Sequence, residues 1–370
     1  MTLPRPAALT DRERFRAVMA YKPFDRLPAY YFGTWRETME RWTREGYGAR
    51  VLHSDGAPCL PGMAPDWEAG MWGAQGLVHI NAMSDRPAQV LEQGSDYTVV
   101  RTPLGAVIKQ GSHSTIPQHL EPALKPTRAS WEAFKSFIDG DDPARHSPDL
   151  IEKAAAFNQR TRVATFMAGS LFGWLREWLG LEGISLLPYD DPELFDEMIA
   201  YMADYFMALY EPVLQRARFD FAYFFEDCCC KTGPLYSPTT YERFLAPHYR
   251  RMIDFYHSHG VEFVLLDSDG KVDVMIPHWL DSGFDIIFPI EVGTWGADPV
   301  ALRRQFGTRL RMFGGVDKHV IPKGDAAIRD HLSRLIPLVE EGGYIPIPDH
   351  RIPPNCSLEQ FLRYIEIFNE

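Results

Sequence analysis

The second half of the chain alternates between short apolar segments and amphipathic helices. The apolar segments cover residues 162–167, 219–227, 262–269, 285–292, 311–317 and 344–350. Strands that are apolar throughout, rather than at every second position, are typical of parallel strands buried on both faces. Strands that alternate with helices along the chain belong to the α/β class. This pattern therefore predicts a parallel sheet covered by helices.

The number of strands decides between a closed barrel and an open sheet. Residues 28–33 form another apolar segment that predicts a buried strand, and we expect one or two more strands between residues 34 and 130. A total of about eight strands fits a (β/α)8 TIM barrel. An open doubly wound sheet is the alternative, but no G-x-G-x-x-G follows an early strand. We therefore predict a single TIM-barrel domain over residues 1–370.

A looser region lies between residues 34 and 130 of this domain. Its tryptophans are scattered among glycines and prolines, without helical or strand periodicity. A β-hairpin is predicted over residues 97–108, with its turn near Pro103 and Gly105. We interpret the region as an elaboration, or cap, that belongs to the barrel domain.

Charge and cysteine content limit the partners and the compartment. The chain has 38 Lys plus Arg against 50 Asp plus Glu, a net charge of −12, and no Lys/Arg run that would bind phosphates, so nucleic acid is not an expected partner. No apolar window of about 18 residues occurs, so no membrane span is expected. The five cysteines are an odd number without framework spacing, which indicates reduced thiols and a cytoplasmic protein.

Acidic residues follow several of the predicted strands. Because the chemistry of a TIM barrel lies at the C-terminal ends of its strands, these residues would share one opening: Glu226, Asp227, Asp267, Asp269, Glu291 and Asp317, with His350 after the last strand. Each carboxylate could instead cap the helix that follows it. Several like charges at one opening repel one another unless a cation offsets them. We therefore predict a metal site formed by Asp267, Asp269, Glu291 and His350.

Two local patterns suggest other chemistry. Residues 263–270 resemble the nucleophile motif of haloacid-dehalogenase phosphatases, but that fold places the motif on its first strand and needs more chain after it. Residues 228–230 are three consecutive cysteines. Neighbouring residues of a strand point in different directions, so three adjacent thiols are poor ligands for one ion. We interpret these thiols as buried packing groups.

Several motifs, taken in order, resemble the uroporphyrinogen decarboxylase superfamily, which includes corrinoid-dependent (cobalamin) methyltransferases. They lie at residues 10–14, 25–28, 226–238, 267–270, 288–291, 313–317 and 341–354 and so span nearly the whole chain. The resemblance implies a single (β/α)8 barrel. It does not by itself distinguish decarboxylation from methyl transfer.

The resemblance favours the methyltransferase branch. True decarboxylases of the superfamily carry an arginine-rich motif after the first strand, whereas residues 30–36 here contain only Arg36. The thiol-methylating branch holds zinc through a His-x-Cys pair and a late Cys. In this chain the pair falls on Asp267 and Asp269, and the late ligand lies nearest His350. Oxygen and imidazole replace sulfur, and this harder donor set suits an oxygen substrate.

The resulting hypothesis is a methyltransferase or O-demethylase. Zinc, or another divalent metal, would act as a Lewis acid on an ether or alcohol oxygen, and the methyl group would pass to cobalamin, either free or on a corrinoid carrier protein. Glu226, Asp227 and His350 are the predicted catalytic residues, with Glu226 or Asp227 as a general acid. The alternatives are a metal-free decarboxylase and a non-catalytic barrel that binds a tetrapyrrole or corrinoid.

Overall fold

The computed structural model describes residues 9–47, 76–112 and 116–370. Six parallel strands form its central sheet, in the spatial order β12-β11-β10-β9-β6-β5. Their bounds are β5 Thr165–Gly169, β6 Phe221–Phe225, β9 Phe263–Asp267, β10 Ile286–Ile290, β11 Arg311–Val316 and β12 Tyr344–Pro348. All six strands predicted from the second half of the sequence are confirmed, with ends shifted by a few residues. The strands lie side by side in the same order as they occur in the sequence. This order is typical of a singly wound barrel, whereas in a doubly wound sheet the strand order reverses once.

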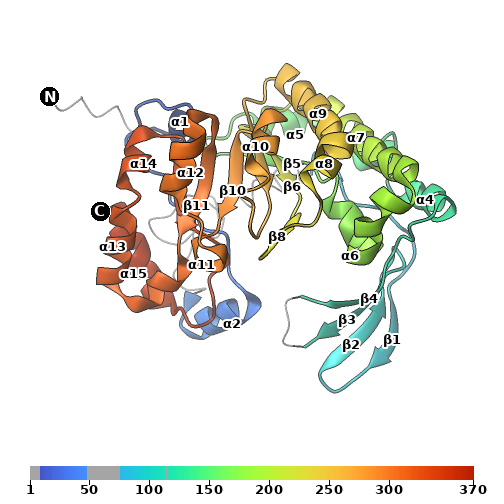
Figure 1. Cartoon of the computed structure of the whole chain (residues 1–370), viewed down its shortest axis with the longest axis horizontal. Helices are drawn as coiled ribbons and strands as arrows, with labels where there is room; N and C mark the ends of the chain where they lie inside the picture. The colour runs from blue at the N-terminus through green and yellow to red at the C-terminus, as the bar shows by residue number, and fades with distance from the viewer. Residues whose placement is uncertain (1–8, 48–75, 113–115) are drawn as a thin grey trace.

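Helices connect successive strands and cover the outside of the sheet (Figure 1). Asp191 caps α7 by accepting a hydrogen bond from the Leu194 amide, with Pro192 in the first helical position. The helices are α1 Asp11–Met19, α2 Arg36–Arg44, α4 Arg128–Phe134, α5 Leu150–Phe157, α6 Gly173–Asp190, α7 Pro192–Leu214, α8 Pro238–Thr240, α9 Ala246–Ser258, α10 Ile276–Asp281, α11 Val292–Trp295, α12 Pro299–Phe306, α13 Asp325–Ser333, α14 Ile336–Glu341 and α15 Leu358–Asn369. The helices between β5 and β12 are the crossovers that parallel strands require.

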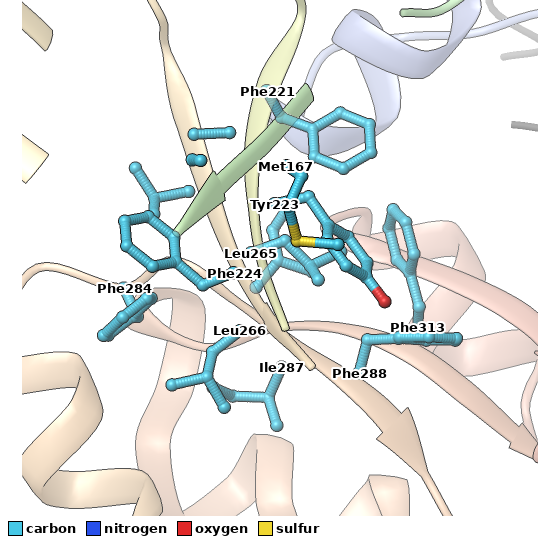
Figure 2. Packing of buried hydrophobic residues seen from close by; sticks show 14 of the residues in the cluster. Met167, Phe221, Tyr223, Phe224, Leu265, Leu266, Phe284, Ile287, Phe288 and Phe313 are labelled. Atoms are coloured by element: carbon cyan, nitrogen blue, oxygen red, sulfur yellow. The ribbon is translucent and has the colours of Figure 1, made fainter. Parts of the chain in front are cut away.

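Aromatic side chains fill the space enclosed by the curved sheet. Phe15 of α1 packs against Phe221 of β6, Phe263 of β9 and Phe313 of β11, with ring centroids 5.2, 6.4 and 6.1 Å away. In the sheet, β11 is adjacent to neither β6 nor β9. One ring can therefore contact all three strands only if the sheet is strongly curved. Figure 2 shows Phe313 and Phe221 within this cluster of buried side chains. Each buried phenylalanine contributes about 1.5–3 kcal/mol through removal of its surface from water.

The strand predicted over residues 28–33 does not form as a regular strand. Tyr30 and Phe32 are buried as expected, but the β-bridge nearest to this segment among the described residues joins Thr34, just after it, to Ile352 in parallel. Two features interrupt the strand: Pro28 has no N–H to donate, and Gly33 has a φ of 92°, outside the extended region. The segment therefore runs beside the end of β12 without a ladder, and among the described residues no ladder joins β5 to β12.

The looser N-terminal region forms a separate antiparallel sheet rather than further barrel strands. Its strands are β1 Gln89–Gln93, β2 Tyr97–Arg101, β3 Val107–Gly111 and β4 Gln118–Glu121. The predicted hairpin over 97–108 is confirmed as β2 and β3, whose turn is closed by Thr102 and Ala106. This sheet projects away from the central sheet, on the side of α6 (Figure 1). In the described part of the chain, no helix has the length and apolar character needed to cross a bilayer.

Candidate metal centre

Three of the four predicted metal ligands lie together beyond the C-terminal edge of the central sheet. Asp269 lies two residues after β9, Glu291 directly follows β10, and His350 lies two residues after β12. One ligand atom from each residue lies within 4.8 Å of the other two. Parallel strands end at the same edge, so side chains from three separate strands meet here.

Glu291 is buried and held in one orientation by two donors. Its Oε2 accepts a hydrogen bond from the Gly270 amide at 2.6 Å, and its Oε1 accepts one from the Thr294 hydroxyl at 2.8 Å. Burial raises the pKa of Glu291, and the negative charge of Asp269 acts in the same direction, while the two donors oppose the shift. This carboxylate is therefore fixed in place at a site where its charge is not fully offset.

The loop that donates to Glu291 requires a glycine. Gly270 has a φ of +84°, and a Cβ atom there would lie 2.7 Å from the backbone of Cys230. The close approach of these two loops brings Asp269 and the Gly270 amide beside Glu291. Gly270 therefore helps to form the site through its backbone alone.

Asp269 and His350 face each other, and one oxygen of Asp269 has no partner. The Nε2 atom of His350 lies 3.0 Å from Oδ2 of Asp269. The Oδ1 atom of Asp269 is buried and receives no hydrogen bond in the described part of the chain. The His350 ring stacks on Trp35, with centroids 5.4 Å apart, and contacts the edge of Phe32 at 5.1 Å. The two aromatic rings limit the orientations of the imidazole.

These residues fit a divalent cation. A buried carboxylate oxygen without a hydrogen bond is costly, and a cation would satisfy it. A protonated His350 would offset one of the two carboxylate charges and would leave Oδ1 of Asp269 unpaired. Two carboxylates and one imidazole are a hard donor set, accepted by zinc and by other first-row divalent metals. Hydrogen bonds from Gly270 and Thr294 to Glu291 are the type of second-shell contact that orients metal ligands.

Asp267, the fourth predicted ligand, is not brought into this set. It is buried at the end of β9 and accepts a hydrogen bond from the hydroxyl of Tyr223 on β6. The prediction relied on acidic residues at strand ends sharing one opening and on the resemblance to a His-x-Cys ligand pair. Asp267 is still the last residue of β9 and faces Tyr223, whereas Asp269 lies beyond the strand end, so the two side chains have different neighbours.

The two acidic residues that follow β6 have partners of their own. Both oxygens of Glu226 are occupied by the backbone amides that begin α6, those of Leu171, Phe172 and Gly173, at 2.7 to 2.9 Å. Burial raises the pKa of Glu226, and these amides oppose the shift. Glu226 thus caps a helix, although this is α6, which precedes β6, and not the helix that follows Glu226 in the chain.

Asp227 forms an ion pair with Arg176 of α6 at 2.7 Å. Burial raises the pKa of Asp227, Arg176 lowers it, and the charge of Asp269 raises it further. Asp227 follows β6 and so lies at the same edge of the sheet as the three candidate ligands. Of the two predicted general acids, it is the one whose carboxylate pairs with an arginine instead of backbone amides.

The remaining polar residues at this edge have structural roles. Asp317 caps the short helix that follows it by accepting a hydrogen bond from the His319 amide at 2.9 Å. Cys228 and Cys229 are buried, as the packing interpretation expects, whereas Cys230 is exposed. None of the three cysteines belongs to the metal-ligand group found among the described residues.

Sequence reasoning did not select Thr294, Trp35, Tyr223 or Arg176. Thr294 carried a usable signal, since it lies three residues after Glu291, in the first turn of the helix that follows β10. Trp35 and Arg176 carried none, because their partners lie more than 50 positions away in the chain.

Comparison with known proteins gives one family match. A family profile described as Uroporphyrinogen decarboxylase (URO-D) matches residues 94–370. No curated protein matches the sequence significantly. Among solved structures, a B12-independent methionine synthase from Shewanella sp. W3-18-1 shares 11% identity, covers 92% of this chain and 95% of its own, and has a TM-score of 0.42. A protein assigned as a vitamin B12-independent methionine synthase from Listeria monocytogenes shares 14% identity, covers 60% and 67%, and has a TM-score of 0.33.

These TM-scores are too low to carry over the reaction of either synthase. The profile match, in contrast, covers every strand of the central sheet and all three residues of the candidate metal centre. This chain belongs to the uroporphyrinogen decarboxylase (URO-D) family.

Proposed function

We propose that this protein is a metal-dependent methyltransferase that removes a methyl group from an oxygen substrate. The observation that carries the proposal is the buried, unpaired Oδ1 of Asp269, which lies in a set of two carboxylates and one imidazole. Family membership supports an enzyme. The hard donor set supports an oxygen substrate in preference to a thiolate.

Asp269, Glu291 and His350 would hold the metal. When bound, the ion supplies a Lewis acid for the substrate oxygen. Gly270 and Thr294 keep Glu291 in position, and the rings beside His350 exclude water from one side of the imidazole.

Asp227 is the proposed proton donor for the leaving oxygen. Burial raises its pKa, which favours the protonated form that a general acid needs, and Arg176 restricts its position. The methyl acceptor would be cobalamin, free or on a separate corrinoid carrier protein. This assignment rests on the superfamily resemblance and not on a contact in the structure.

Decarboxylation is the second candidate, because the matching family profile is described by that activity. A porphyrinogen presents several carboxylates, and they would meet Asp227, Asp269 and Glu291 at the same edge of the sheet. Placing the carboxylates of the substrate beside those of the protein is electrostatically unfavourable unless cations offset the charges. The charge of the site therefore favours methyl transfer.

Elemental analysis combined with a cob(I)alamin methylation assay tests the proposal. We expect about one equivalent of divalent metal in the protein and methylation of cob(I)alamin by at least one member of a panel of aryl methyl ethers. Asp269→Ala should lose both the metal and the activity. Asp317→Asn is the matched control, since Asp317 also follows a strand but only caps a helix, and it should retain both. Metal-free protein that decarboxylates uroporphyrinogen would establish the second candidate instead.

A further inference from the structure

A groove of about 580 Å³ lies between β4 and α6, outside the candidate metal centre. Strand β4 supplies one wall through Leu120 and Glu121, and α6 and the turn after it supply the other. The amide of Leu124, just beyond β4, donates a hydrogen bond to the carbonyl of Trp178 on α6. A backbone hydrogen bond therefore joins the two walls of the groove at one end.

A break in α6 shapes the second wall. Gly180 has a φ of 74° and a ψ of 165°, so the helix is interrupted at this residue and continues in a new direction. Only glycine adopts this conformation without strain. The second half of α6 consequently turns Leu181 and Leu186 outward, where they are 56% and 49% exposed.

Exposed apolar side chains are concentrated on this part of the surface. Most of the exposed large apolar residues of the described chain lie on α6 or on the antiparallel sheet and its flank: Val90, Leu91, Ile116, Leu120, Leu181, Leu186 and Tyr189. Scattered exposed apolar residues are normal, but Leu120, Leu181 and Leu186 all line the groove, and a group of this kind marks an interaction surface. These three leucines come from two separate elements and are about half exposed, as expected for a site that receives the side chains of a protein partner.

The charges that line the groove are all negative. Its charged lining residues are Glu121, Glu177, Glu182, Asp190 and Asp191, and neither Lys nor Arg lines it among the described residues. Glu177 pairs with Arg176, and Glu121 lies 3.7 Å from Arg101. Glu182 and Asp190 have no cationic partner in the described part of the chain. An acidic rim around an apolar floor is complementary to a partner that carries both leucines and basic side chains.

A second copy of this chain is a poor occupant. A symmetric contact would place the same five carboxylates against themselves, and each chain already carries a net charge of −12. Like charges placed opposite each other in an interface cost several kcal/mol. The remaining occupant that suits both the apolar floor and the acidic rim is a different protein.

We propose that the groove between β4 and α6 docks a basic amphipathic helix of a partner protein. Leucine-type side chains of that helix lie on Leu120, Leu181 and Leu186, and its Lys or Arg side chains pair with Glu182 and Asp190. This is the helix-in-groove mode of recognition. The proposal is independent of the reaction proposed above.

The groove also lies close to the metal centre's edge of the sheet. Glu226 holds the first turn of α6, and Asp227 pairs with Arg176 one turn later. Glu177, the next residue, lines the groove. A partner docked here is therefore held beside the C-terminal ends of the strands.

Peptide binding tests the proposal. The probe is a synthetic helical peptide of about 18 residues with Leu at i, i+3, i+4 and i+7 and Lys on both flanks, and its binding to the full chain is measured by fluorescence anisotropy. We expect a micromolar Kd that weakens at least about tenfold between about 50 and 300 mM salt. A peptide with Glu in place of Lys should not bind.

Two double variants separate the groove from the rest of the surface. Leu181→Ser with Leu186→Ser, and Glu182→Lys with Asp190→Lys, should each weaken binding at least about tenfold. Ile151→Ser with Glu152→Lys is the matched control on α5, where Ile151 is 67% exposed, and it should leave binding unchanged. Circular dichroism confirms that all variants are folded. No binding of the Lys peptide, equal binding by all variants, or a dimer that the groove variants dissociate would overturn the proposal.

Discussion

Carboxylates follow both β6 and the pair β9 and β10, yet the two groups have different surroundings. After β6, both oxygens of Glu226 are occupied by three backbone amides, and Asp227 is paired with Arg176. After β9 and β10, Asp269 and Glu291 approach each other and His350, and one buried oxygen of Asp269 has no donor. A structural carboxylate therefore differs from a candidate ligand by the donors already bound to it, and not by its position at a strand end.

Removing a carboxylate from the second group should have the largest effect. We expect Asp269→Ala to weaken zinc binding by more than about 100-fold, beyond the 10–100-fold loss typical of second-shell changes. Isothermal titration calorimetry with zinc measures this affinity. Glu226→Gln is the control, because Glu226 has its own partners, and its zinc affinity should match that of the wild type. An equal loss of zinc affinity in Asp269→Ala and Glu226→Gln would contradict the distinction between candidate ligands and structural carboxylates.

Substitution in the first group should instead lower stability. In Glu226→Gln, the amide NH₂ would face at least one backbone N–H of the α6 first turn and leave it unpaired. An unsatisfied buried donor costs about 1–3 kcal/mol, so the free energy of unfolding should fall by that amount in urea titrations. Asp317→Asn at another strand end is the comparison, and its stability should change by less than about 1 kcal/mol. Unchanged stability of Glu226→Gln would contradict a capping role.

Loss of a hydrogen bond to a candidate ligand should have a smaller effect. Thr294→Val removes the hydroxyl that donates to Oε1 of Glu291 while keeping a similar shape. We expect zinc affinity to fall by about tenfold. Thr294→Ser retains the hydroxyl and should bind zinc as the wild type does. Equal affinities in the Val and Ser variants would show that Glu291 does not depend on this contact.

The smallest expected effect is a pH dependence that arises from Glu226. Burial raises its pKa in the folded state above the ordinary value of 4.5, so the folded protein binds more protons than the unfolded chain just above pH 4.5. The contribution of Glu226 to stability therefore decreases as pH rises from 4.5 through the folded-state pKa. The stability difference between wild type and Glu226→Gln, measured by urea unfolding, should be larger at about pH 4.5 than at about pH 8. A difference that grows with pH would mean that the three amides outweigh burial.

The strands of the second half were predictable because their signal is local. Each of β5, β6, β9, β10, β11 and β12 is a short, nearly continuous apolar run that can be recognised in the sequence without reference to distant residues. The segment over 28–33 has the same apolar character but lacks a regular ladder. Its outcome depended on Pro28 and on the turn at Gly33, which apolar content alone does not reveal.

The candidate metal centre was predictable only in part. Asp269, Glu291 and His350 could be selected because strand ends of a barrel share one opening. Asp267 was selected by the same rule, yet its hydrogen bond to Tyr223 depends on which neighbouring strand it faces. Trp35 beside His350 lies more than 300 residues away in the chain, so no spacing indicates the contact.

The α/β class, the crossover helices and the acidic residues at the strand ends could all be derived from the sequence, because hydrophobic patterns and residue chemistry are local properties. Which carboxylates are bound by amides or arginine, and which face one another, depends on the three-dimensional structure. The same is true of the break in α6 at Gly180 and of the acidic groove that α6 forms with β4. Those outcomes depend on donors brought from distant segments, and their distances are set by packing rather than by order along the chain.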